Sequence, residues 1–276
     1  MRIEPYTSDG VSASDLLNLL HDSGIDTHHS SAEYDSHPRY LQALAASRAS
    51  GRSFEHVVKL ASPSFNSDFF DASQVKTAVD QELSDLGVER IASLQWLFRT
   101  PDPSDDETRL RLLRDQFEVL EGTFHELIEC GKVANVSSFP YSLSFARATA
   151  ALKPVSALAN YLSLFELDAL EVANNFESLI AIRPFAGSTE PLDAATEFDR
   201  LEAAALIEQG RDHHEVALEF PLLSSSVSTV ITSINGKRSR NTAIRIGAAT
   251  HPDDKRFERM AAALKYPATS VEPCAQ

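Results

Sequence analysis

The sequence predicts an α/β fold of the (β/α)8 TIM-barrel type, in a single domain that spans residues 1–276. Short β-rich runs alternate with helical patterns along the chain, which is typical of parallel strands joined by right-handed crossovers. A barrel of this type needs about 250 residues, so a chain of 276 residues has a suitable length. The first expected strand is not followed by a glycine-rich phosphate turn, so an open doubly wound sheet is the second choice.

Eight segments have the composition and length of strands. They are Arg2–Pro5, Gly24–Thr27, His56–Leu60, Ile91–Phe98, Lys132–Ser137, Val155–Leu158, Leu179–Arg183 and Thr229–Thr232. Helical patterns cover Ser12–Ser23, His37–Ser50, Ser73–Gly87, Asp105–Cys130, Ser142–Leu152, Leu167–Phe176, Ala195–Gln209, His213–Leu223 and Asp253–Leu264. Ser73 is an expected N-cap, Gly87 a left-handed helix stop, and Asp105 begins an acidic first turn.

Composition and charge exclude several classes of partner. The formal net charge of −15 argues against a nucleic-acid or anionic-membrane surface, since both need concentrated positive charge. Only two cysteines occur, which offers no disulfide framework or cysteine metal site. No secretory signal pattern and no apolar run of about 20 residues is visible. We therefore expect a cytoplasmic protein with a small-molecule substrate; the sequence does not indicate its oligomeric state.

Five segments resemble signatures of the aldo-keto reductases and occur in the order that this family shows. They are GIDTHHS, LIECGKVANVSSF, ALANYLSLFE, LIAIRPFAGS and VSTVITSINGKRSRN, between Gly24 and Asn241. Each motif is short and degenerate, so the prediction depends on their common order. The chain is thus similar to the aldo-keto reductase superfamily, in which NAD(P)H delivers hydride to a carbonyl and a tyrosine protonates the developing alkoxide.

The catalytic tetrad that this resemblance implies is incomplete. Asp26 matches the family aspartate and Lys59 the family lysine, and we expect them to pair at the barrel mouth. The family tyrosine belongs five positions after the aspartate, where this chain has Ser31, and a serine hydroxyl is a much weaker acid. Tyr34 could supply the proton instead if the loop takes a different course.

The family histidine is also replaced. Arg99 of QWLFRTPDP stands in its position, and period-two alternation puts Gln95, Leu97 and Arg99 on one face of the strand. If that face points inward, Arg99 can grip a carboxylate or phosphate in a bidentate manner. The alternative is a salt bridge at the rim with Asp102 or another loop acid.

The residues that would contact the cofactor match the family only in part. Ser137 and Ser138 replace a serine–asparagine pair, and Ile182 followed by Arg183 replaces the aromatic that stacks on the nicotinamide. A group of polar and basic residues resembles the site for the adenosine 2′-phosphate: Ser233, Lys237, Arg238, Ser239, Arg240 and Asn241. This group favours NADPH over NADH, and its alternative interpretation is a solvated basic turn.

Several histidines lie near the expected mouth, but their spacing predicts no metal site. His28 and His29 are adjacent on a strand, so they point to opposite sides, and His37 follows in a loop. Zinc needs three or four converging ligands. His28 or His29 could instead supply the missing proton, because imidazole titrates in a suitable range.

The resemblance implies an NADPH-dependent oxidoreductase that reduces a small, anionic carbonyl compound with altered proton-donor chemistry. Two alternatives remain open. One is a catalytically inactive aldo-keto reductase-like barrel that binds nucleotide or a protein partner. The other is a barrel lyase or isomerase that uses Lys59 and Asp26 without nicotinamide, since fold alone does not fix the chemistry.

Overall fold

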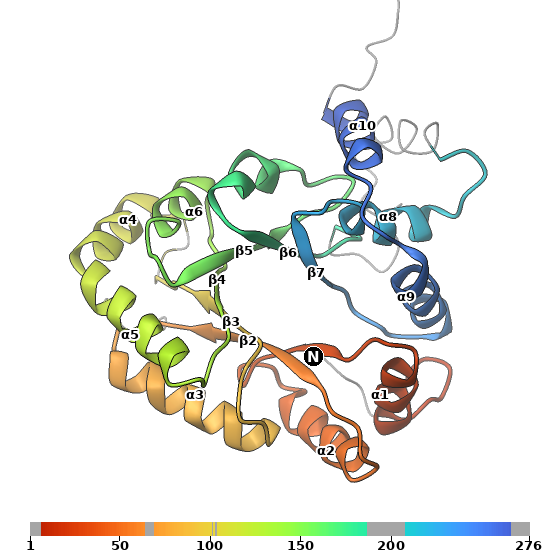
Figure 1. Ribbon diagram of the computed structural model, residues 1–276, viewed down its shortest axis with the longest axis horizontal. Coiled ribbons are helices and arrows are strands. Elements are labelled where there is room, and N and C mark those ends of the chain that lie inside the picture. The colour runs from red at the N-terminus through yellow and green to blue at the C-terminus, as the bar shows by residue number, and fades with distance from the viewer. Residues whose placement is uncertain (1–6, 64–68, 101, 103, 187–207, 266–276) are drawn as a thin grey trace, which may run out of the picture.

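The computed structural model describes residues 7–63, 69–100, 102, 104–186 and 208–265. Seven parallel strands form one sheet in chain order. They are β1 (Thr27–Ser30), β2 (Glu55–Ala61), β3 (Ser93–Leu97), β4 (Val136–Ser138), β5 (Val155–Tyr161), β6 (Ser178–Ile182) and β7 (Val227–Ile231). The sheet curls into a nearly closed barrel with the helices outside it (Figure 1), so the predicted α/β-barrel architecture is confirmed.

Among the described residues, helices or 3-10 turns lie between successive strands, with one helix before β1 and two after β7. They are α1 (Ala13–Asp22), α2 (His37–Arg48), α3 (Ala72–Leu86), α4 (Asp106–Asp115), α5 (Phe117–Glu129), α6 (Leu143–Thr149), α8 (His213–Leu222), α9 (Lys237–Ala249) and α10 (Asp254–Lys265), with 3-10 turns η1 (Asp168–Glu171) and η2 (Ala173–Asn175). None of the described helices is long and apolar enough to cross a membrane.

The first and last parts of the described chain meet at the gap between β1 and β7, which do not pair with each other. The N–H of Ser8 donates to the carbonyl of Asn235 at 3.0 Å, and Arg240 of α9 pairs with Asp9 at 2.8 Å. Figure 1 shows α1 and α9 as neighbours on this side of the barrel. The loop before α1 is thereby tied to the loop after β7.

The core between the sheet and the helices contains the single tryptophan of the chain. Trp96 of β3 is 1% exposed and packs edge-on against Phe124 of α5, with ring centroids 5.0 Å apart. Its indole N–H donates to the carbonyl of Ser62 at 2.7 Å, so the buried polar atom is satisfied. This side of β3 faces the helices, whereas Gln95 faces the barrel interior.

Sequence patterns predict most of the elements, with corrections at particular points. The expected strand Gly24–Thr27 begins at Thr27 instead, because Gly24 and Ile25 form the exit turn of α1 and donate to its carbonyls. The long helical pattern divides at Gln116 into α4 and α5. Residues 167–176 form only 3-10 turns. The expected strand Arg2–Pro5 and nearly all of the expected helix Ala195–Gln209 lie outside the described residues.

The two ends of α3 show whether the predicted N-cap and the predicted left-handed helix stop are correct. Asp71, rather than Ser73, is the N-cap, and its carboxylate accepts from the N–H groups of Ser73 and Gln74. A carboxylate is favoured there by the positive end of the helix dipole. At the other end, Gly87 is in the left-handed region with φ 62° and ψ 43°, as predicted. Asp105 also caps α4, as its acidic first turn predicts.

We predict that Gly87→Ala lowers the free energy of unfolding by about 1–2 kcal/mol, because a left-handed alanine is strained. The added Cβ would also meet the guanidinium of Arg48, which donates to the carbonyl of Leu86 at 2.7 Å. Urea denaturation would measure the loss. Gly51→Ala is the matched control, because Gly51 has φ 80° but open space around it. An equal loss in both variants would show that the Arg48 contact contributes nothing.

Candidate functional site

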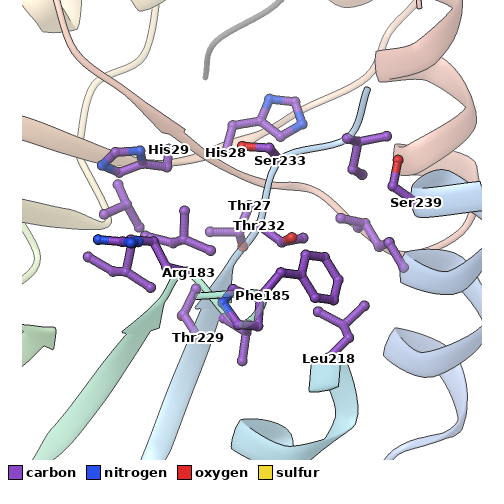
Figure 2. Close-up of a pocket in the computed structure, with 18 of the residues that line it drawn as sticks. Thr27, His28, His29, Arg183, Phe185, Leu218, Thr229, Thr232, Ser233 and Ser239 are labelled. Atoms are coloured by element: carbon purple, nitrogen blue, oxygen red, sulfur yellow. The ribbon is translucent and has the colours of Figure 1, made fainter. Parts of the chain in front are cut away.

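A pocket of about 630 Å³ opens at the carboxyl ends of the strands. Its wall includes His29, Lys59, Gln95 and Tyr34 on one side. Figure 2 shows His29 and Arg183 together, with Ser239 of α9 and Leu218 of α8 across the pocket. The described lining contains two cations and no aspartate or glutamate, although the protein carries a net charge of −15. The pocket is therefore a local positive site in an acidic molecule.

Asp26 does not belong to this pocket, so the expected pair of Asp26 with Lys59 is wrong. Thr27 is the register partner of Glu55, which places Asp26 five residues below Lys59 along the sheet. At ~3.3 Å per residue this is roughly 16 Å. Asp26 is exposed at the amino end of β1, because the strand begins later than its sequence suggests.

The same shift of the strand brings His29 to the mouth and identifies Tyr34 as the phenol beside Lys59. A spacing of five residues, counted from His29, leads to Tyr34. The tyrosine ring lies 6.0 Å from the His29 ring, and Lys59 Nζ lies 5.1 Å from the Tyr34 ring centroid. All three residues line the pocket. The structure therefore brings together a phenol, a lysine and a histidine at one rim.

Ser31 has a structural role that differs from the expected catalytic one. Its side chain is fully buried, and Oγ donates to the carbonyl of Lys59 at 3.0 Å and accepts the N–H of Glu33 at 3.3 Å. Further bonds hold the loop, from the Tyr34 N–H to the Ser31 carbonyl and from the Ala32 N–H to Glu82 of α3. Ser31 fixes the loop that carries Tyr34.

Glu33 is the carboxylate that Asp26 was expected to provide. Its Oε2 lies 2.8 Å from Lys59 Nζ and 2.9 Å from Arg99 Nη2, and Arg99 Nη1 contacts Oε1. Burial acts to raise the pKa of Glu33, but the bonds to Arg99 and Lys59 outweigh it and lower the pKa to about 2. The second interpretation of Arg99, a rim salt bridge with a loop acid, is therefore correct. Asp102 is not that acid.

His29 and Gln95 form a polar pair across β2. His29 Nε2 lies 2.6 Å from Gln95 Oε1, and because this oxygen only accepts, the imidazole donates from Nε2. Burial lowers the pKa of His29 to about 3, so the ring is neutral near pH 7. A neutral ring that donates from Nε2 has a lone pair on Nδ1. His29 therefore has a fixed tautomer.

Arg183 supplies the second cation of the pocket from the end of β6. Its backbone has φ 61°, an uncommon conformation for a non-glycine residue and one that often marks functional sites. The guanidinium lies 4.4 Å from the Tyr161 ring centroid, and Nη2 donates to the carbonyl of Ala186 at 2.9 Å. Glu166 lies 4.0 Å away, at the limit of an ion pair. Ile182 lines the pocket beside it, as its sequence position implies.

The turn before α9 retains only part of the expected 2′-phosphate cluster. Ser233 and Ser239 line the pocket, and Ser239 Oγ accepts from the N–H groups of Asn235 and Gly236. Arg238 pairs with Asp212, and the buried Arg240 pairs with Asp9. Lys237 and Asn241 are exposed on the first turns of α9. Arg238 and Arg240 thus have internal carboxylate partners that sequence spacing does not reveal.

Ser137 and Ser138 do not line the pocket, so the prediction that they contact the cofactor there is wrong. Both are buried, and their hydroxyls form internal hydrogen bonds: Ser137 with Ser93 at 3.1 Å, and Ser138 from Thr149 at 2.9 Å. The next residue, Phe139, lines the pocket instead. Among the described residues, no group of three or more histidine, cysteine or acidic side chains could hold a metal ion.

Sequence reasoning missed the roles of Glu33 and Gln95. A glutamate in a polar loop gives no signal by itself, because its two cationic partners are distant in sequence. Gln95 carried a weak signal, since strand alternation places it on the same face as Arg99. A buried amide in the interior of a barrel strand is uncommon and requires hydrogen-bond partners.

The architecture matches solved structures of aldo-keto reductases. The holo form of an aldo-keto reductase from Bacillus halodurans has a TM-score of 0.67 at 16% identity, covering 90% of this chain and 86% of that one. Its apo form gives 0.65 at 15% identity, covering 93% and 89%. An aldo-keto reductase from a Medee basin deep-sea metagenome library gives 0.61 at 13% identity, covering 91% and 85%. No family model and no curated protein matches the sequence. The chain therefore has the α/β-barrel fold of the aldo-keto reductases, as the order of its sequence motifs predicts.

Proposed function

We propose that the protein is a cytoplasmic, NADP-dependent oxidoreductase that reduces a small, anionic carbonyl compound, with Tyr34 as the proton donor. One observation carries the proposal: Tyr34 and Lys59 lie at one rim of a pocket whose described charged lining is entirely cationic. Hydride transfer to a carbonyl builds negative charge on oxygen, and an acid beside a cation is the arrangement that relieves it.

The donor set fits an extended nicotinamide dinucleotide. The pocket lining includes Lys59, Arg183 and Ser239, and the Arg183 side chain is 39% exposed. A pyrophosphate needs such positive charge and backbone N–H groups, which the start of α9 also provides. Lys237 is the basic residue that would meet a 2′-phosphate, since Arg238 and Arg240 are paired with carboxylates.

A bound nicotinamide would supply the hydride, and the residues of the chain would manage the charge and the proton. The Tyr34 hydroxyl would transfer its proton to the carbonyl oxygen as negative charge builds there. The Lys59 ammonium stabilises the resulting phenolate. Glu33 holds Lys59 and Arg99 in place, so it acts as a positioning residue.

The charge of the site supports an anionic substrate. Lys59, Arg99 and Glu33 together carry a net charge of about +1, because Glu33 stays ionised and both cations share it. Arg183 adds a further positive charge at the wall. A carboxylate on the substrate would reduce the cost of gathering these cations. The 2-oxo acids are the simplest carbonyl compounds with this property.

The direct test measures NADPH consumption with pyruvate, phenylpyruvate, glyoxylate and the uncharged propanal. We expect turnover with the oxo acids and weaker turnover with propanal, and binding of NADPH that changes its fluorescence. Binding without turnover of any carbonyl would favour the inactive barrel. Absence of NADPH binding would remove the nicotinamide from the proposal.

We predict that Glu33→Gln lowers kcat about 10–100-fold, because Lys59 and Arg99 lose the carboxylate that orients them and small misplacements at a reacting centre are costly. Steady-state kinetics with the best oxo acid would measure this loss. Glu55→Gln is the matched control, since Glu55 is exposed at the other end of the same strand as Lys59. Similar losses in the two variants would contradict a specific role for Glu33.

A further inference from the structure

The barrel interior below Tyr34 contains a buried amide whose donors are unused. Gln95 is 0% exposed, and its Nε2 has no hydrogen-bond partner in the described part of the chain. An amide NH2 group carries two donors, and buried donors are normally satisfied. Gln95 lines the pocket, and its Nε2 lies just beneath the pocket surface, so a small side-chain movement must open this donor to a ligand.

The orientation of this amide is fixed by its neighbour. Gln95 Oε1 accepts the N–H of His29 at 2.6 Å, which directs Nε2 away from the histidine. His29 stays neutral because burial lowers its pKa, so this bond persists through the neutral pH range. The bond joins β1 to β3 across β2, where Lys59 is the register partner of Gln95. Gln95 is therefore held on the same layer of the barrel as the lysine.

Arg99 is poorly suited to hold the substrate oxygen, although it stands at the position of the family histidine. Its guanidinium grips Glu33 with two nitrogens and also bonds to Tyr141, and it is absent from the described lining of the pocket. Gln95 does line the pocket, and it lies one histidine ring away from Tyr34. The neutral amide can donate to an oxygen without becoming a competing acid.

We propose that Gln95 Nε2 donates a hydrogen bond to the substrate's carbonyl oxygen, with His29 as the residue that positions it. The inference depends on the proposed reductase function for its catalytic meaning. Tyr34 and Gln95 then hold the same oxygen, one as acid and the other as a permanent donor. Only the tyrosine proton is transferred, and the amide bond strengthens as negative charge grows on the oxygen.

Kinetics of two variants distinguish the donor from a structural tether. Gln95→Met removes both hydrogen-bonding groups, whereas Gln95→Glu keeps an oxygen that can accept from His29 and has no donor once the carboxylate is ionised. Both are expected to lower kcat by about 10²–10³-fold, as loss of one oxyanion donor does elsewhere. Gln81→Met, on the exposed face of α3, is the matched control and should stay within about twofold. Normal kcat in Gln95→Met would overturn the donor role.

A binding measurement on the wild-type protein keeps the inference independent of turnover and of variant folding. The probe is oxamate, an unreactive analogue of a 2-oxo acid, added to 15N-labelled protein. The side-chain amide resonances of Gln95, assigned with the Gln95→Met variant, are expected to shift on titration while those of Gln81 stay in place. Unmoved Gln95 resonances would overturn the inference. A shift in a protein that reduces no carbonyl would uphold the contact and reject the proposed reductase function.

Discussion

Replacing Tyr34 with phenylalanine is expected to lower kcat for carbonyl reduction by about 10²–10⁴-fold, the usual contribution of a placed general acid. The ring and its contacts with His29 and Lys59 would remain, because phenylalanine differs only by the hydroxyl. NADPH affinity and the thermal unfolding midpoint should stay close to those of the wild type. Single-turnover kinetics would isolate the chemical step from product release.

A second variant tests whether Tyr34 and Lys59 act as a unit. Lys59→Met alone should also reduce kcat strongly, because the phenolate loses its stabilising charge. If the two residues serve one proton transfer, the double variant should be little worse than the poorer single variant. Multiplicative losses would show that they act in separate steps. A Tyr34→Phe enzyme with kcat within twofold of the wild type would reject Tyr34 as the acid.

The second large expected effect is a steep loss of stability in mild acid, which arises from buried histidines behind β1 and β2. His28 and His56 are 4% and 1% exposed, and the Tyr40 hydroxyl lies 3.1 Å and 3.2 Å from their Nδ1 atoms. Burial lowers the pKa of His28 to about 3 and that of His56 to about 4. One hydroxyl proton cannot serve both rings, so one imidazole donates and the other accepts. The ring that accepts must be neutral for this network to form, and burial keeps the other ring neutral too.

The direction of the pH effect follows from these values. The unfolded chain binds protons with a histidine pKa near 6.5, whereas the folded protein resists protonation until much lower pH. The contribution of the two neutral histidines to the free energy of unfolding is fully present above about pH 6.5. It is lost as the pH falls toward the pKa values of the folded protein. Below pH 6.5 each histidine lowers the free energy of unfolding by about 1.4 kcal/mol per pH unit. The pair therefore lowers it by about 5 kcal/mol at roughly pH 4.5. This loss is comparable to the whole stability of many domains.

Urea denaturation at a series of pH values would measure the effect. His28→Phe should make the pH dependence shallower by one proton, because the phenylalanine ring can still stack on Phe54. His125→Gln is the control, since His125 is 64% exposed on α5 and lies far from the network in sequence. If the slope below pH 6.5 is the same in the wild type and His28→Phe, His28 does not titrate as its burial predicts.

The fold was predictable because six of the seven described strands contain apolar residues and lie between helical patterns. The segments 155–158 and 179–183 are mostly apolar, and they lie in β5 and β6, of which β5 extends to Tyr161. β1 is the exception, since Thr27, His28, His29 and Ser30 are all polar. The apolar Ile25 led to the prediction of a strand from Gly24, although Ile25 belongs to the exit turn of α1. A three-residue error there misplaced Asp26 and Ser31, whereas Lys59 and Tyr34 do line the pocket.

The site was less predictable because its charges pair through space. Glu33 precedes Lys59 by 26 residues and Arg99 by 66, and only the folded barrel brings them together. The helix α9 escaped prediction for a related reason. Lys237, Arg238 and Arg240 lie in its first turn, where the helix dipole disfavours positive charge, and two of them are stabilised by Asp212 and Asp9.

The burial of Trp96 has a practical consequence for every measurement above. The single buried indole, packed between β3 and α5, should fluoresce at short wavelength in the folded protein. A shift of this emission to longer wavelength would therefore report unfolding. Gln95, the preceding residue, lines the pocket, so a nicotinamide bound there as proposed would lie within energy-transfer range of the indole. The emission wavelength of Trp96 would thus follow denaturation, and its emission intensity would follow binding of the proposed cofactor.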